Sequence, residues 1–220
     1  MKRLFLAVKL VSTMAVASIA TAQTQIGGPD QAQFEELARA AASRSNFAEA
    51  LRYQRLAVAN IDRVEPRKMV YRSWVRYKLG ALMIFARDCA AAIPVFRESA
   101  RLVSDREPAE PDPYWKDNII WASDGVAQAY ICLNRPADAA TELETIELRF
   151  SEAPYADCAK AMVKISGTLA YSSLGEIDRA RSRLTQARSF LAKCDEPDRR
   201  TYFSSVLDRL ASKLSPSSSE

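Results

Sequence analysis

One amphipathic segment occurs four times in this 220-residue chain, and this repetition limits the possible folds more than any other feature. The copies align on a central alanine, and a second small residue lies twelve positions before that alanine in every copy. Around each central alanine, apolar residues recur at the spacing of a helix that buries one face. The four pairs of small residues are Ala38 and Ala50, Gly80 and Ala92, Ala127 and Ala139, and Thr168 and Ala180.

The constant offset of twelve indicates two antiparallel helices joined by a short turn. Such helices approach to about 8–10 Å where neither carries a bulky side chain. Residues suited to ending one helix and starting the next lie between the paired positions. They are Ser45-Asn46, Arg87-Asp88, Asn134-Arg135 and Gly175-Glu176. The pattern therefore predicts an all-α chain built from repeated helix hairpins.

The pattern resembles tetratricopeptide (TPR) repeats. The family's spaced Leu and Gly/Ala in the first helix, and its Ala, aromatic and Ala in the second, are matched most fully by "LGALMIFARDCAAAIPVFRESA" at 79–100. The segment "FEELARAAASRSNFAEALRYQRLA" at 34–57 matches next best. The resemblance implies a right-handed α-solenoid of about four TPR-like helix hairpins plus a C-terminal capping helix.

The length of the repeat departs from that family. Successive central alanines are 42, 47 and 41 residues apart, whereas the family's unit is about 34 residues and HEAT-type arrays use about 40–47. The extra length falls in proline-containing segments, because proline stops one helix and permits the next. We therefore describe the expected fold as TPR-like.

The N-terminus has the pattern of an export signal. Lys2, Arg3 and Lys9 precede an uncharged run of eleven residues over 10–20, and Ala20-Thr21-Ala22 follows as a small-residue cleavage site. This is typical of a cleavable secretory signal, and the run is shorter than the about 20 residues that span a bilayer. We expect a protein secreted across the inner membrane into the periplasm, with no membrane span after cleavage.

These patterns define the expected domain organisation. Residues 1–22 are assigned to the signal peptide, 23–214 to the helical-repeat domain and 215–220 to a disordered tail. Within the repeat domain, the helix pairs are expected at about 31–60, 67–103, 114–150 and 155–192, followed by a cap over 197–214.

Charge and composition argue against several classes of function. Without residues 1–22, the chain has 28 Lys plus Arg against 27 Asp plus Glu, interspersed along its length. A nucleic-acid partner requires a concentrated basic patch. The chain has no histidine, no G-x-S-x-G turn and no phosphate or dinucleotide loop. We expect no enzyme activity, no cofactor and no metal site, and we interpret the acidic group Glu142, Glu144 and Glu147 as a solvated helix face.

The four cysteines are expected to form disulfides in an oxidising compartment. In the solenoid, Cys89 begins the second helix of copy two and Cys132 ends the first helix of copy three. Neighbouring antiparallel helices place such a start beside such an end, and Cys158 and Cys194 stand in the corresponding relation in copy four. We therefore expect Cys89–Cys132 and Cys158–Cys194; four buried thiols are the alternative.

The resemblance implies that first helices line a concave surface that holds a peptide or a partner helix. This predicts a protein-protein interaction module with a partner in the cell envelope. The competing interpretations are that Trp74 and Trp121 lie in the core, and that the protein is a structural or assembly protein that self-associates or braces an envelope complex. The expected partner-binding residues are Trp74, Tyr77, Lys78, Trp121, Asp124, Gln128, Met162 and Ile165.

Overall fold

The computed structural model describes residues 29–104, 115–150 and 156–214. The signal peptide expected at 1–22 and the tail expected at 215–220 lie outside these ranges. Within the described ranges, every regular element is a helix. In chain order they are α2 (Pro29–Ser43), α3 (Phe47–Val64), α4 (Met69–Phe85), α5 (Cys89–Ser104), α6 (Trp115–Cys132), α7 (Pro136–Phe150), α8 (Asp157–Ser173), α9 (Ile177–Leu191) and α10 (Pro197–Leu214).

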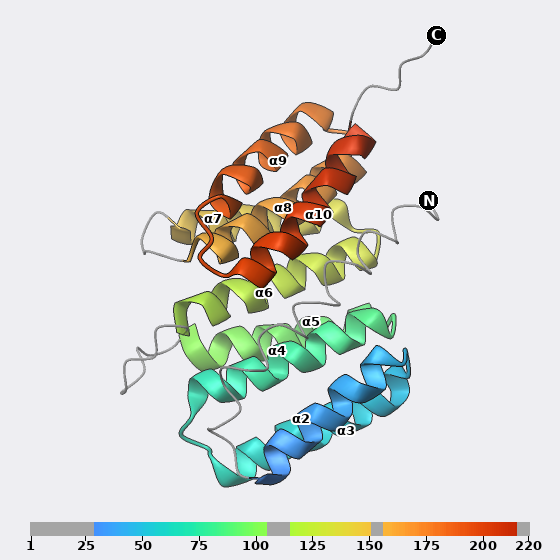
Figure 1. Cartoon of the computed structure of the whole chain (residues 1–220), viewed down its shortest axis with the longest axis vertical. Helices are drawn as coiled ribbons and strands as arrows, with labels where there is room; N and C mark the ends of the chain where they lie inside the picture. The colour runs from blue at the N-terminus through green and yellow to red at the C-terminus, as the bar shows by residue number, and fades with distance from the viewer. Residues whose placement is uncertain (1–28, 105–114, 151–155, 215–220) are drawn as a thin grey trace.

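The helices form four antiparallel hairpins, α2/α3, α4/α5, α6/α7 and α8/α9, stacked in chain order and followed by α10 (Figure 1). The predicted all-α solenoid of helix hairpins with a C-terminal helix is confirmed. None of the helices in the described ranges combines the length and hydropathy that crossing a membrane requires.

Each hairpin turn has the same backbone geometry. The residue five positions before the central alanine has a positive φ in every copy, at Ser45 (59°), Arg87 (67°), Asn134 (59°) and Gly175 (80°). The next residue's N–H donates back to a carbonyl in the preceding helix, as from Asp88 to Met83 at 2.8 Å and from Glu176 to Tyr171 at 2.9 Å. This left-handed cap closes the helix end, so one local device repeats the hairpin four times.

Along one side of the array, the first helices contact one another from α4 onward. Helix α4 contacts α6, α6 contacts α8, and α8 contacts α10. Among the described residues, the second helices α3, α5, α7 and α9 show no comparable contact with one another. We call the side of the array formed by α4, α6 and α8 the inner face. It is the side that the sequence predicted as the partner-binding surface.

Phe96 sets the close packing of three helices. Its side chain on α5 is 1% exposed, and its ring lies against the backbone of α4 at Gly80 and of α6 at Gly125. A Cβ on Gly80 would lie 2.7 Å from Phe96 Cε1, and a Cβ on Gly125 would overlap the same ring. Glycine at these two positions therefore lets one ring join two consecutive hairpins.

Both predicted cysteine pairs are present as disulfides. The Cα atoms of Cys89 and Cys132 are 6.2 Å apart, and those of Cys158 and Cys194 are 4.9 Å apart. The first bond joins the start of α5 to the end of α6, and the second joins the start of α8 to the connection that precedes α10. Each disulfide closes a loop and so restricts the unfolded chain, which stabilises the fold by about 3–4 kcal/mol on the chain-entropy model.

We predict that Gly125→Ala lowers the free energy of unfolding by about 1–2 kcal/mol, although alanine is the better helix former. The added methyl group would overlap the buried Phe96 ring. Urea unfolding monitored by circular dichroism measures the change. Gly167→Ala is the matched control, because a Cβ there meets only the Arg183 side chain at 3.6 Å, so this change should stabilise by about 0.5–1 kcal/mol. Equal effects of the two substitutions would contradict the packing role of Phe96.

Candidate functional site

All eight residues predicted to bind a partner are buried in the structure. None offers a free surface in this conformation. Their exposed fractions are 3% for Trp74, 6% for Tyr77, 7% for Lys78, 6% for Trp121, 0% for Asp124, 8% for Gln128, 3% for Met162 and 0% for Ile165.

Three of these residues form an aromatic cluster across α4 and α6. The rings of Trp74 and Tyr77 stack with centroids 5.3 Å apart, and the Trp121 ring meets them edge-on at 5.3 and 5.7 Å. Phe96 continues the cluster 5.8 Å from Tyr77. Such aromatic pairs contribute about 0.5–1.5 kcal/mol each beyond their buried area. The cluster therefore holds α4 against α6, which favours the core interpretation of both tryptophans.

Helix α10 packs against α9 and α8, and its first turn reaches this cluster. The Arg199 guanidinium lies 4.0 Å from the centre of the Trp121 ring, within the range of a cation–π interaction. Burial raises the pKa of Tyr202, an effect that Arg209 opposes. The sequence identified α10 as a capping helix, but it did not show that Arg199, near the start of α10, reaches Trp121 of α6.

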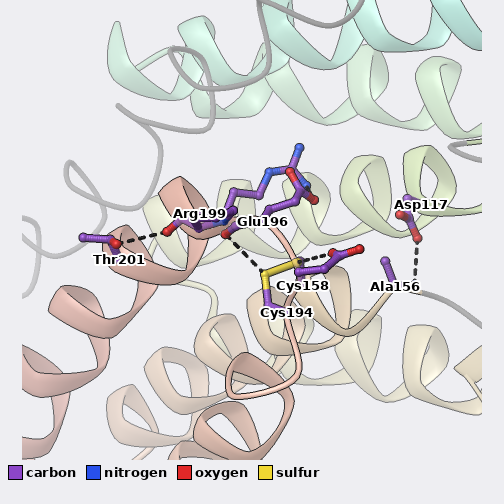
Figure 2. Close-up of a disulfide and its surroundings, with 9 residues drawn as sticks. Asp117, Ala156, Cys158, Cys194, Glu196, Arg199 and Thr201 are labelled. Carbon is purple, nitrogen blue, oxygen red and sulfur yellow. Dashed lines mark hydrogen bonds and ion pairs between the residues drawn. A yellow bond between two sulfur atoms is a disulfide. The ribbon is translucent and has the colours of Figure 1, made fainter.

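The Cys158–Cys194 disulfide positions the start of α10 (Figure 2). Cys158 lies in the first turn of α8, and Cys194 is three residues before Pro197. The start of α8 is in turn tied to α6, because the Ala156 N–H donates to Asp117 Oδ1 at 3.1 Å. The disulfide thus places Arg199 over the aromatic cluster.

Several buried polar atoms in and around the cluster have no hydrogen-bond partner among the described residues. Their residues come from α4, α6, α8 and α10. Most buried polar atoms in folded proteins are paired with protein or ordered water, and an unpaired one costs about 1–3 kcal/mol. The atoms are Trp74 Nε1, Trp121 Nε1, Asp124 Oδ1, Ser166 Oγ and Tyr202 OH. We call these five residues the polar cluster.

Asp124 is the acid of the polar cluster. Its second oxygen, Oδ2, accepts a hydrogen bond from Gln128 Nε2 at 2.6 Å. Burial raises the pKa of Asp124 to about 7, against the opposing effects of Ser166 and Gln128. The Ser166 hydroxyl is near the carboxylate but does not meet the geometry of a hydrogen bond. Asp124 therefore changes its charge near neutral pH inside the fold.

We predict that the free energy of unfolding falls as the pH rises from about 4 to about 7. In this window Asp124 is protonated in the folded chain, whereas in the unfolded chain, with the ordinary pKa of 3.8, it is ionised. Ionisation of Asp124 in the unfolded chain alone lowers the free energy of unfolding by up to about 1.4 kcal/mol for each pH unit in this window. The effect levels off above pH 7. Asp124→Asn should remove it. Urea unfolding of both proteins from pH 4 to 8 tests this, and parallel curves would contradict the raised pKa.

Lys78 has an internal partner. It forms an ion pair with Glu35 of α2, and both side chains are largely buried. Glu35 also accepts hydrogen bonds from Tyr71 OH and Gln31 Nε2, each at 3.0 Å. Burial lowers the pKa of Lys78, and the Glu35 carboxylate opposes that effect. In this structure Lys78 therefore fastens α4 to α2.

We predict that Glu35→Ala lowers the free energy of unfolding by about 3 kcal/mol, because it leaves the Lys78 ammonium group buried without its partner. Lys78→Met in the same chain should recover much of this loss, since it removes the uncompensated charge. Thermal and urea unfolding of the two single variants and the double variant measure the coupling. Additive losses would show that the pair does not interact.

Two acidic residues of α7 are used in structural contacts. Glu144 accepts from Tyr171 OH at 2.7 Å and pairs with Arg179 at 2.8 Å, and Glu147 pairs with Lys164 at 2.9 Å. One set of potential metal ligands, Cys158, Asp195 and Glu196, lies close together. The Cys158 sulfur is in a disulfide, so it offers no thiolate. The predicted solvated face is wrong for Glu147, whose side chain is largely buried between Lys164 and Arg183.

Solved structures share this architecture, although sequence comparison finds no relative. No protein-family model matches the chain, and no curated protein matches it significantly. The crystal structure of Podosopora anserina putative kinesin light chain nearly identical TPR-like repeats is similar with a TM-score of 0.56 and 16% identity, over 87% of this chain and 94% of that one. A point variant of that protein is similar with a TM-score of 0.56 and 17% identity, over 87% of this chain and 86% of that one. The fold is TPR-like, as the sequence pattern predicted.

Proposed function

We propose that this chain is an exported protein-interaction module that binds a segment of a partner protein in the cell envelope at its inner face. The TPR-like architecture supports this proposal, because stacked helix hairpins present a long continuous surface for a partner. The signal-like N-terminus and the two disulfides support an oxidising location such as the periplasm.

The observation that carries the proposal is the polar cluster on the inner face. Two indole N–H groups, a carboxylate oxygen and two hydroxyl groups are buried there without hydrogen-bond partners in the described part of the chain. A peptide segment brings both carbonyl acceptors and N–H donors, so it can satisfy indoles and carboxylate together. Aromatic side chains surrounded by polar groups are also the usual composition of an energetically dominant binding patch.

We predict that Ser166→Ala reduces partner capture without lowering thermal stability. The Ser166 hydroxyl has no hydrogen-bond partner among the described residues, so its removal should leave the free energy of unfolding unchanged or raise it by up to about 1 kcal/mol. A lost hydrogen bond to the partner should weaken capture by roughly five- to tenfold. Crosslinking in the native envelope, followed by quantitative identification of the captured proteins, provides the measurement.

Ser99→Ala is the matched control. The Ser99 hydroxyl is buried outside the polar cluster and donates to the Ser73 carbonyl at 2.7 Å. Its loss should lower stability by about 1 kcal/mol and leave capture unchanged. If no protein is captured, or if the two variants affect capture equally, the inner face is not the binding surface.

A further inference from the structure

We propose that the outer side of α3 docks the protein peripherally on an anionic phospholipid surface. This inference goes beyond the proposed function, because it concerns a different surface and a partner that is not a protein. Helix α3 is the second helix of the first hairpin, at the opposite end of the array from α9 and α10 (Figure 1). The inner face consists of first helices, so a contact through the outer side of α3 leaves that face uncovered.

The outer side of α3 carries charge of one sign. Five exposed residues recur there at positions i, i+3, i+4, i+7 and i+11, which lie on one side of a helix. We call these residues the basic face, and its three arginines extend along about 16 Å of the helix axis. Helical periodicity thus gathers positive charges that look interspersed in the sequence. The basic face consists of Arg52, Arg55, Leu56, Ala59 and Arg63.

No carboxylate of the described chain pairs with an arginine of the basic face. The Arg52 guanidinium lies 4.6 Å from the centre of the neighbouring Tyr53 ring. Arg63 donates to the amide oxygen of Asn60 at 3.0 Å. Arg55 is exposed and makes no ion pair or side-chain hydrogen bond with any described residue. All three positive charges therefore lack a negative counterpart within the described part of the protein.

The two acidic residues of α3 lie outside the basic face and have partners of their own. The Glu49 carboxylate accepts from Asn46 Nδ2 at 2.8 Å and lies 3.6 Å from the Arg44 guanidinium. Asp62 pairs with Arg72 of α4 at 2.8 Å. Neither carboxylate is free to neutralise the basic face, so this surface attracts anions from outside the chain.

Exposed arginines at the other end of the array are compensated. Arg179 of α9 pairs with Glu144 at 2.8 Å, and Arg188 of α9 pairs with Asp208 at 3.1 Å. Exposed arginine is therefore not uncompensated throughout this protein. The difference singles out α3 as the helix whose outer side offers charge to a partner.

The composition of the basic face fits a phospholipid surface. A guanidinium group binds phosphate through two parallel N–H groups. Leu56, between the arginines, is 42% exposed, and an aliphatic side chain among basic residues suits the boundary between headgroups and acyl chains. A bilayer presents phosphates continuously, so guanidinium groups along one side of one helix reach them at the same time. Each arginine near such a surface strengthens partition about fivefold, which gives roughly 100-fold for three.

Sedimentation with vesicles tests the inference on the protein purified after export, with both disulfides formed. We expect binding to phosphatidylcholine vesicles that contain about one-third phosphatidylglycerol, and none to vesicles of phosphatidylcholine alone. Raising the salt concentration from about 0.1 M to about 1 M should weaken binding at least tenfold, because the screening length falls from about 10 Å to about 3 Å.

Substitutions on the basic face should act according to charge. Arg55→Ala should lower the partition coefficient about fivefold, and Arg52→Glu with Arg63→Glu should abolish binding, because the face then becomes net negative. Leu56→Ser should weaken binding severalfold at both salt concentrations, since contact with acyl chains is not screened. All four positions are exposed, so circular dichroism should show unchanged folding.

Arg200→Ala is the matched control, because Arg200 is an exposed arginine of α10, at the other end of the array. It should bind vesicles as the wild type does. Equal effects of Arg55→Ala and Arg200→Ala, or equal binding to neutral and anionic vesicles, would overturn the inference. So would an absence of vesicle binding combined with loss of a captured acidic envelope protein in Arg55→Ala, which would make the basic face a protein contact. Ser166→Ala should leave vesicle binding unchanged, so this inference and the proposed function can fail separately.

Discussion

The close approach of helices at residues without bulky side chains is the constraint on which the rest of the structure depends. Phe96 is the clearest case, because its ring occupies the space that Gly80 leaves on α4 and Gly125 leaves on α6. One side chain thereby joins two hairpins and brings their first helices into contact. That contact assembles Trp74, Tyr77 and Trp121 into one cluster. A bulkier residue at either glycine would separate the helices and the aromatic rings with them.

The inner face combines two kinds of contact with different consequences. The aromatic cluster and the Lys78–Glu35 pair are complete, and they hold neighbouring elements together. The polar cluster is incomplete, because atoms of Trp74, Trp121 and Asp124 have no hydrogen-bond partner among the residues that the structure describes. Unpaired buried polar groups are rare in folded proteins. Under the proposed function, the same side chains have structural and binding roles, so substitutions of Trp74 or Trp121 by alanine alone could not separate these roles.

Much of the fold could be predicted from local sequence pattern. The offset between small residues located the hairpins, and the order of helix starts and ends selected the two disulfides from three possible pairings. The candidate site was predicted less completely. The pattern placed Trp74, Trp121 and Asp124 on one surface, but it did not find Arg199, Tyr202 or Ser166. Contacts of α10 with α6 depend on how far the array curves, and helical spacing carries no information about curvature.

The sequence by itself determined the elements of this protein: paired helices, short turns between them at four equivalent positions, and cysteines at the ends of adjacent helices. These properties depend on residues close together in the chain or on a repeated period. Only the tertiary structure decided which faces are covered. It put Arg199 of α10 over Trp121, gave Lys78 a partner in Glu35, and enclosed Asp124 so that burial raises its pKa to about 7. Exposure and charge state are set by residues far away in the chain, which meet only when the stacked hairpins curve.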